Sequence, residues 1–188
     1  ESAMITEIRC SQLYRPMECA GVLHFQNLPP DEESEPARQG TAYGELTRRL
    51  IQGGDIPKQA ANGVYFDHDM YFHARPTVEE VNANRQSEVL CEQRIDWQTR
   101  SGIWIRGSYD RSFVRDGWLV MDDDKYGWGI VEVKPNWQLL GYIIGEAIRR
   151  NEGFPGVILR INQPRPHHED GCLREWRMPW SEMLMWKE

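Results

Sequence analysis

The chain lacks three features that would each point to a particular class of protein. No apolar run approaches the roughly 20 residues that a membrane-spanning helix needs, so no membrane partner is expected. The cysteines include no C-x-x-C pair, which in a cytoplasmic protein predicts reduced thiols; they are Cys10, Cys19, Cys91 and Cys172. Positive charge is scarce, because 22 lysines and arginines face 29 acidic residues. The net charge of -7 argues against a protein that coats DNA non-specifically, although a local basic groove remains compatible with it.

The remaining composition is that of one folded domain. A hydrophobic fraction of 40% and 8 tryptophans predict a globular chain rather than a disordered one. With 188 residues, the chain is long enough to bury a core as a single domain over 1–188. The mixed polar stretch 4–9 does not resemble a signal peptide, so a cytoplasmic setting is expected. The stretch 27–36, rich in proline and acids, predicts an exposed connection.

Hydrophobic periodicity predicts strands mixed with helices. Helices are expected over 40–51 with Thr41 as N-cap, over 76–86 and over 136–150, with a short helix inside 11–25. Alternating runs predict strands at 89–97, 103–106 with its extension 112–114, 118–121, 156–161 and 173–178. The Asp116-Gly117 pair predicts a tight hairpin turn. Strands with flanking helices make the fold α/β or α+β.

A cluster of carboxylates lies around the predicted hairpin. Side chains two apart on a strand share a face, so Asp123 and Lys125 are expected to point together while Asp124 points away. If the stretch that ends at Asp110 forms the neighbouring strand, its carboxylate joins Asp123. Hard oxygen ligands of this kind suit Mg²⁺ or Mn²⁺.

Other side chains are candidates for the same site. Gln138 and Tyr142, four residues apart, lie on one face of the following predicted helix. Glu45, on the helix expected over 40–51, is a candidate third carboxylate for the metal; the alternative is a solvated glutamate that pairs with Arg48 or Arg49.

A second acid-x-Lys motif competes with the first. Glu132-Val133-Lys134 lies in the strand-like run 130–134 and offers the same pair of functional groups as Asp123 and Lys125. The residues alone leave the two motifs near parity.

The order of these motifs resembles that of a known family, the PD-(D/E)XK nucleases of the RecB-like branch and especially their phage-borne relatives. Gly107-Ser108-Tyr109-Asp110 resembles the family's G-x-x-D motif, Asp123-Asp124-Lys125 its D-x-K motif, and Gln138 with Tyr142 its Q-x-x-x-Y motif. The runs 125–129 and 163–165 are similar to the phage-type subgroup, whose spacing favours Asp123 and Lys125 over the rival motif.

The resemblance implies a restriction-endonuclease-like core, in which helices flank a mixed β-sheet, and DNA cleavage that depends on Mg²⁺ or Mn²⁺. By position, Asp110 and Asp123 would bind the metal, and Lys125 would orient or activate the attacking water and stabilise charge in the transition state. Gln138 and Tyr142 would position the motif strand and contact the nucleic acid backbone. Arg165 would reach a phosphate or, alternatively, hold a turn.

The sequence departs from this family at several positions. Gly44 stands where RecB-like enzymes often carry a metal-binding histidine, which leaves Glu45 next to it as a substitute. Some relatives bind an iron-sulfur cluster through one early and three late cysteines, but only Cys172 lies late here, so no cluster is expected.

These observations support two functional hypotheses. The first is an exonuclease that serves phage recombination or DNA processing in the cytoplasm of a bacterial host. The second is a catalytically inactive module of the same fold that binds DNA or a protein partner. Both hypotheses are compatible with a homo-oligomer and with a recombination partner protein.

Overall fold

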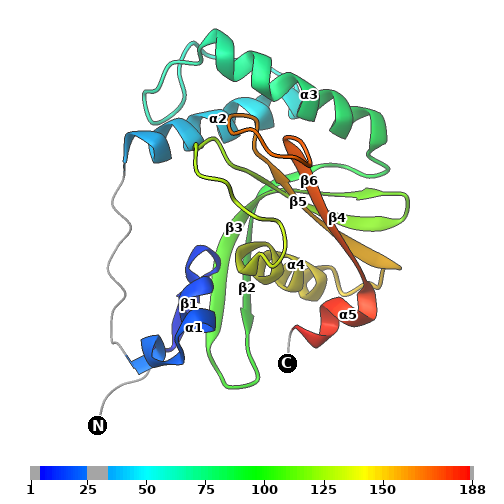
Figure 1. The fold of residues 1–188 in the computed structure, drawn as a ribbon. Helices are drawn as coiled ribbons and strands as arrows, with labels where there is room; N and C mark the ends of the chain where they lie inside the picture. The colour runs from blue at the N-terminus through cyan, green and yellow to red at the C-terminus, as the bar shows by residue number, and fades with distance from the viewer. Residues whose placement is uncertain (1–4, 25–33, 187–188) are drawn as a thin grey trace.

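The computed structural model describes residues 5–24 and 34–186, which form a mixed six-stranded sheet with helices on both faces (Figure 1). The fold is therefore α/β, as predicted. The strands are β1 (Glu7–Arg9), β2 (Leu90–Gln98), β3 (Trp104–Arg115), β4 (Trp118–Asp124), β5 (Gly156–Asn162) and β6 (Leu173–Pro179). The longer helices are α2 (Glu35–Gln52), α3 (His68–Asn84) and α4 (Trp137–Arg150), and the short ones are α1 (Tyr14–Glu18) and α5 (Trp180–Met185). Two 3₁₀ turns, Cys10–Gln12 and Ala20–His24, flank α1.

Strand β3 is the centre of the sheet's connectivity. It pairs antiparallel with β2 along residues 104–112, and with β4 along 111–115. Strand β1 pairs parallel with residues 104–106 of β3. Because β2 occupies one edge over this whole length, β1 and β4 share the other edge and leave residues 107–110 of β3 unpaired between them. Strand β5 then pairs parallel with β4, and β6 antiparallel with β5.

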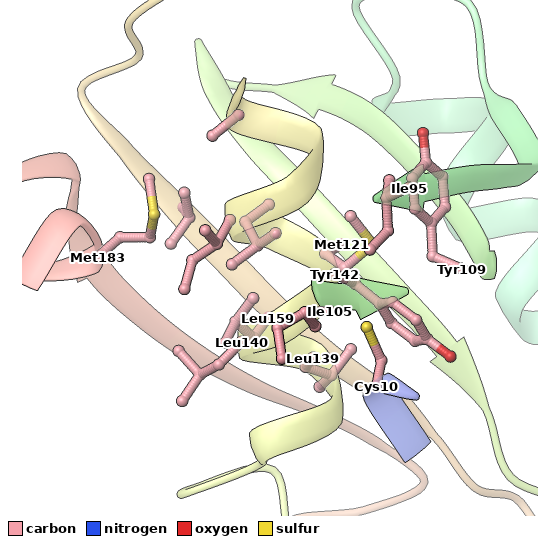
Figure 2. Close-up of a cluster of buried hydrophobic side chains, with 14 of the residues drawn as sticks. Cys10, Ile95, Ile105, Tyr109, Met121, Leu139, Leu140, Tyr142, Leu159 and Met183 are labelled. Atoms are coloured by element: carbon pink, nitrogen blue, oxygen red, sulfur yellow. The ribbon is translucent and has the colours of Figure 1, made fainter. Parts of the chain in front are cut away.

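The two faces of the sheet carry separate hydrophobic clusters. Alternate residues of β4 and β5, including Leu119, Met121 and Leu159, pack with α4 in the main core (Figure 2). Their neighbours Val120 and Ile158 point to the opposite face and pack towards α2 and α3. This alternation, with a period of two, buries both faces of the central strands. No helix in the described part of the chain is long and apolar enough to cross a membrane.

Most of the predicted elements are present. Strands β2 to β6 and helix α4 lie within a few residues of the predicted ranges, and the Asp116-Gly117 turn joins β3 to β4. The connection expected over 27–36 falls mainly outside the described residues. All four cysteines are free thiols, of which Cys10 and Cys91 are buried.

Two predicted helix starts are wrong. Helix α2 begins before Thr41, because the Ser34 hydroxyl caps it by accepting from Ala37 N, while the Thr41 hydroxyl donates to Ala37 O inside the helix. Helix α3 begins before Pro76, because the Asp67 carboxylate accepts from Met70 N at 2.8 Å. A side-chain cap of this kind satisfies a backbone donor that the first turn leaves unpaired.

The strand-like run 130–134 is a loop. Strand β1 was not predicted, whereas the short helix expected inside 11–25 is present as α1. Side chains bind the backbone of this loop: Val131 N donates to Gln163 Oε1, and Asn136 Nδ2 donates to Glu132 O. The hydrogen bonds that a strand would make to a neighbour are made to these amides instead.

Candidate active site

The β3–β4 hairpin brings Asp110 and Asp123 together. The turn residues Asp116 and Gly117 both have positive φ, 53° and 76°, as a two-residue hairpin turn of type I′ requires. The antiparallel register then sets Asp110 opposite Asp123, one residue beyond the last paired position. Asp124 N donates a 2.7 Å hydrogen bond to Asp110 Oδ2, which fixes the Asp110 carboxylate against the end of β4.

Asp123, Lys125, Gln138 and Tyr142 form one connected group. Lys125 Nζ lies 2.7 Å from Asp123 Oδ2 and donates to Gln138 Oε1 at 3.1 Å. Gln138 Nε2 donates to Asp123 Oδ1 at 3.3 Å and to Tyr142 Oη at 3.0 Å. Gln138 therefore ties the carboxylate and the ammonium of β4 to helix α4. The structure brings together all five residues that were predicted as catalytic.

Helix α4 can approach the sheet closely because small residues face it. The Asn136 side chain caps the helix by accepting from Leu139 N at 3.0 Å, which places Gln138 in the first turn. A Cβ at Gly141 would lie 2.6 Å from Leu13 Cδ1, and one at Gly145 would lie 2.9 Å from Ile95 Cβ. Larger residues at these positions would push α4 away from Leu13 and from Ile95 of β2.

Asp124 points to the other face, as the alternation predicts. Its carboxylate accepts two hydrogen bonds from Arg111, at 2.6 and 2.7 Å, and one from Asn162 Nδ2 at 2.7 Å. The side chains of Asp124 and Arg111 are both 1% exposed. This buried pair anchors the end of β4 while Asp123 and Lys125 stay on the face of the candidate site.

Electrostatics favour a cation near the two facing carboxylates. Burial, followed by the negative charges of Asp123 and Asp124, raises the pKa of Asp110 well above its usual value. Burial also raises the pKa of Asp123, although Lys125 opposes that shift. Burial disfavours the Lys125 ammonium, but the Asp123 carboxylate outweighs it and raises the pKa of Lys125. One ammonium therefore only partly compensates a site with several carboxylates.

These side chains line a hollow of about 280 Å³. Its lining consists of Gly40, Thr41, Gly44, Glu92, Asp110, Asp123, Asp124, Lys125 and Gln138. The glycines come from α2, so the hollow lies between this helix, the end of the β3–β4 hairpin and the start of α4. Apart from Asp124, whose carboxylate is engaged by Arg111, the walls supply three carboxylates and one ammonium.

Glu92 is the carboxylate that sequence reasoning missed. It has a φ of 53°, which is rare for a residue other than glycine. The β2–β3 ladder is interrupted at this point, because Cys91 and Gln93 are paired while Glu92, opposite Asp110, is not. Burial raises the pKa of Glu92. An alternating sequence gives no sign of this distortion, which turns the Glu92 carboxylate into the hollow.

Glu45 does not lie in this hollow, contrary to the prediction that it binds the metal. Its carboxylate accepts from Arg49 Nε at 2.9 Å and from Ala61 N at 2.8 Å, and it forms an ion pair with Arg49. Glu45 thus pairs with Arg49 on the helix, as the alternative interpretation predicted. Gly44 does line the hollow, and a Cβ there would meet no atom within 4 Å.

The rival motif lies elsewhere. Glu132 is 64% exposed, and the Nε2 atom of the His168 ring lies 3.8 Å from its carboxylate. Lys134 Nζ lies 5.5 Å above the Trp176 ring. Because neither residue lines the hollow, the geometry favours Asp123 and Lys125 as the acid-x-Lys motif.

The run 163–165, which resembles the phage-type subgroup, holds the loop that follows Lys125. Gln163 Nε2 donates to Gly127 O at 3.2 Å and to Gly129 O at 2.7 Å. Arg165 Nη1 donates to Tyr126 O, and its guanidinium lies 3.8 Å from the centre of the Tyr126 ring. Of the two roles considered for Arg165, these contacts fit the one in which it holds a turn.

The residues present can accommodate one hard divalent cation with few protein ligands. Among the described residues, no group of three or more His, Cys, Asp and Glu side chains is close enough to hold a metal ion by itself. Mg²⁺, however, is often bound by one or two carboxylates, with water and substrate phosphate as its other ligands. Asp123 Oδ2 is buried and, despite its short distance to Lys125, accepts no hydrogen bond of good geometry. Asp110 and Asp123 would be the ligands.

The family model described as "Protein of unknown function (DUF2800)" matches residues 8–188. This chain belongs to the DUF2800 family. No curated protein matches it. Among solved structures, "Crystal structure of SSO0001" is 12% identical and covers 99% of this DUF2800 chain and 75% of its own, with a TM-score of 0.39. A likeness of that size carries no argument about function.

Proposed function

We propose that this DUF2800 chain is a metal-dependent deoxyribonuclease, a hydrolase of DNA phosphodiester bonds. The observation that carries the proposal is the convergence of Asp110, Asp123, Lys125 and Gln138 on one hollow. Two opposed carboxylates with a lysine beside them are the groups that phosphodiester hydrolysis needs at one point. The exonuclease mode and the role in phage recombination or DNA processing follow from the resemblance to PD-(D/E)XK nucleases alone.

Each residue has a distinct task in this proposal. A divalent cation, when bound, supplies Lewis acidity to the phosphate and lowers the pKa of water. Asp110 is held in place by Asp124 N and Asp123 by Gln138 Nε2, so neither carboxylate needs to reorganise. Lys125 carries the positive charge that stabilises negative charge on the phosphoryl oxygens. The Gln138 amide directs the Lys125 ammonium towards the hollow.

A second candidate function is a catalytically inactive module that binds DNA or a protein partner. The observation in its favour is the short supply of metal ligands: Glu45 is engaged by Arg49, and Gly44 offers no side chain to the hollow. Only the first candidate predicts cleavage of DNA.

The deciding experiment is the degradation of linear double-stranded, linear single-stranded and closed circular DNA in Mg²⁺ or Mn²⁺. We expect the unmodified chain to cleave and Asp123→Asn to lose at least 100-fold in rate, as when a transition-state electrostatic group is removed, about 10² to 10³. Glu132→Gln is the matched control, because Glu132 is an exposed carboxylate of the rival motif, and we expect it to keep its activity. Loss in Glu132→Gln alone would contradict the assignment of the site.

Metal binding is tested separately by thermal unfolding with and without Mn²⁺. A cation that binds only the folded chain raises its stability, by about 2.7 kcal/mol at 100 times its Kd. We expect this gain in the unmodified chain and in Glu132→Gln, and its loss in Asp123→Asn. A chain that gains stability from Mn²⁺ but cleaves none of the three DNA forms would support the inactive module.

A further inference from the structure

A second hollow, of about 690 Å³, opens beside the candidate active site, where β1 ends. Its walls come from β1, β2 and β3, and they include Gly107 and Ser108 of the β3 segment whose edge is unpaired. Three arginines line it, namely Arg9, Arg94 and Arg106. We call it the arginine hollow.

The charge of the arginine hollow is opposite to that of the chain. Its charged lining is the three arginines together with Glu7 and Asp96, which gives a formal balance of 3 - 2 = +1 within a chain of -7. Glu7 is engaged, because it forms a 2.6 Å ion pair with Arg106. Arg9 and Arg94 are exposed, and no hydrogen bond or ion pair of their guanidinium groups occurs among the described residues. Two cations are therefore free to bind an anion.

The arginine hollow lies next to the candidate active site. Tyr142 lines the arginine hollow and Gln138 lines the smaller one, and Gln138 Nε2 donates to Tyr142 Oη at 3.0 Å. Figure 2 shows Tyr142 beside Cys10, at the end of the main core where β1 stops. Along β3, Gly107 is three residues from Asp110, which at about 3.3 Å per residue is roughly 10 Å. The two hollows are therefore close enough for one DNA strand to reach both.

We propose that the arginine hollow holds the phosphodiester backbone of the DNA strand that enters the candidate active site, with Arg9 and Arg94 as its phosphate contacts. This inference rests on the proposed function. Guanidinium groups pair with phosphate through parallel hydrogen bonds, and the Ser108 hydroxyl on the same wall is a further donor. Contacts of this kind fix the register of a strand without reading its sequence. They would hold the strand while Lys125 and the carboxylates act on a nearby bond.

The test measures DNA binding in the absence of cleavage. A fluorescein-labelled single-stranded 15-mer is titrated with the full chain in EDTA, and the Kd is measured by anisotropy between 50 and 200 mM KCl. Each lost phosphate contact lowers the slope of log K against log salt by about 0.7 for single strands. We expect the double variant Arg9→Gln/Arg94→Gln to lose about 1.4 from this slope and to bind about ten-fold or more weakly at 50 mM salt.

Lys58→Gln is the matched control, since Lys58 is an exposed cation that lines neither hollow. We expect the slope, the Kd and the cleavage rate of this control to be unchanged. The thermal unfolding midpoint verifies that the double variant is folded. An equal loss of affinity in the control, or an unchanged slope in the double variant, would overturn the assignment of the arginine hollow.

The outcomes separate this inference from the proposed function. DNA binding that depends on Arg9 and Arg94 in a chain that cleaves nothing supports the arginine hollow and refutes the nuclease. If the chain cleaves DNA but its affinity for DNA does not depend on Arg9 and Arg94, the nuclease is supported and the assignment of the arginine hollow is refuted.

Discussion

At the scale of single residues, the candidate site has a cost in stability. Burial and the neighbouring Asp123 and Asp124 charges penalise the ionised Asp110 carboxylate and raise its pKa well above the usual value. A residue with so strongly raised a pKa destabilises the metal-free fold at any pH above that pKa. Sites of this kind commonly exchange stability for function.

We therefore predict that Asp110→Asn stabilises the metal-free chain. The amide keeps an oxygen that can accept from Asp124 N but removes the charge. In EDTA at pH 7.5, we expect a gain of about 1 kcal/mol, or roughly 2–4 °C in Tm for a chain of this size, measured by thermal unfolding. The same variant should lose the gain from Mn²⁺. Asp55→Asn, at an exposed aspartate, is the control, and a drop in the Tm of Asp110→Asn in EDTA would contradict the prediction.

The residues of the site differ in how well the sequence predicts them. The relation of Asp123 to Lys125 is fixed by the period of a strand, and that of Gln138 to Tyr142 by the period of a helix, so both pairs could be predicted. Glu45 could not be placed, because consecutive helix residues differ by about 100° in direction, and only the packing of α2 decides that Gly44 faces the hollow. Glu92 depends on a local distortion opposite Asp110, which is a property of the tertiary structure.

At the scale of secondary structure elements, helix α4 is seated by glycines. A Cβ at Gly145 would lie 2.9 Å from both Ile95 Cβ and Ile95 Cδ1, and 3.0 Å from Trp97 Cδ1. Ile95 and Trp97 belong to the buried core, so they cannot give way without cost.

We predict that Gly145→Ala lowers the free energy of unfolding by about 1–3 kcal/mol, the usual cost of overpacking a core. The matched control is Gly44→Ala, because Gly44 also lies in a helix but has open space at its Cβ. There we expect a gain of up to about 1 kcal/mol from helix propensity. Urea unfolding measures both. If the two substitutions had the same sign, close packing of α4 would not be the cause.

The starts of elements were harder to predict than their presence. Pro76 indicated a helix start by the usual rule, yet α3 runs through it, because Asp67 caps the helix earlier and Met70, Ala74, Thr77 and Val81 bury one continuous face. The run 130–134 has the residue types of a strand, but distant side chains satisfy its backbone. Hydrogen bonds between residues far apart in the chain leave no local sequence pattern.

At the scale of the whole molecule, buried ion pairs connect five elements. Arg111 of β3 binds Asp122 and Asp124 of β4, and Arg160 of β5 binds Asp122 at 2.9 Å and Glu80 of α3. Arg115 of β3 also joins Glu80 to Glu175 of β6. The side chains of Arg111, Arg160 and Asp122 are at most 1% exposed. Loss of one partner from such a network leaves an uncompensated charge in the interior.

We predict that this network makes the fold sensitive to acid. Although burial opposes it, Arg111 and Arg160 lower the pKa of Asp122 to about 2. The contribution of Asp122 to the free energy of unfolding is about 2 kcal/mol. It is complete above the unfolded pKa near 4 and is lost as the pH falls towards 2. Asp110 and Asp123 act in the opposite direction, because their raised pKa values favour the folded state as they take up protons.

Urea unfolding at pH 6 and pH 3 tests this prediction with Asp122→Asn. The free energy of unfolding of the variant should be about 3–5 kcal/mol lower at pH 6, because two buried arginines lose a shared partner. Below pH 4, its free energy of unfolding should depend less on pH than that of the unmodified chain. Glu169→Gln, at an exposed glutamate, is the control and should behave as the unmodified chain. An acid loss that is as large in Asp122→Asn as in the unmodified chain would show that Asp122 is not its origin.

We also expect the tight turn at Asp116-Gly117 to influence the order in which the molecule assembles. It separates Asp110 from Asp123 by only 13 residues along the chain, and contacts between such near neighbours form early during folding. Gln138 and Tyr142 arrive only when α4 docks on the sheet. We therefore expect Asp110 and Asp123 to come together in the nascent hairpin before Gln138 is present, so that the candidate site is completed only when α4 docks.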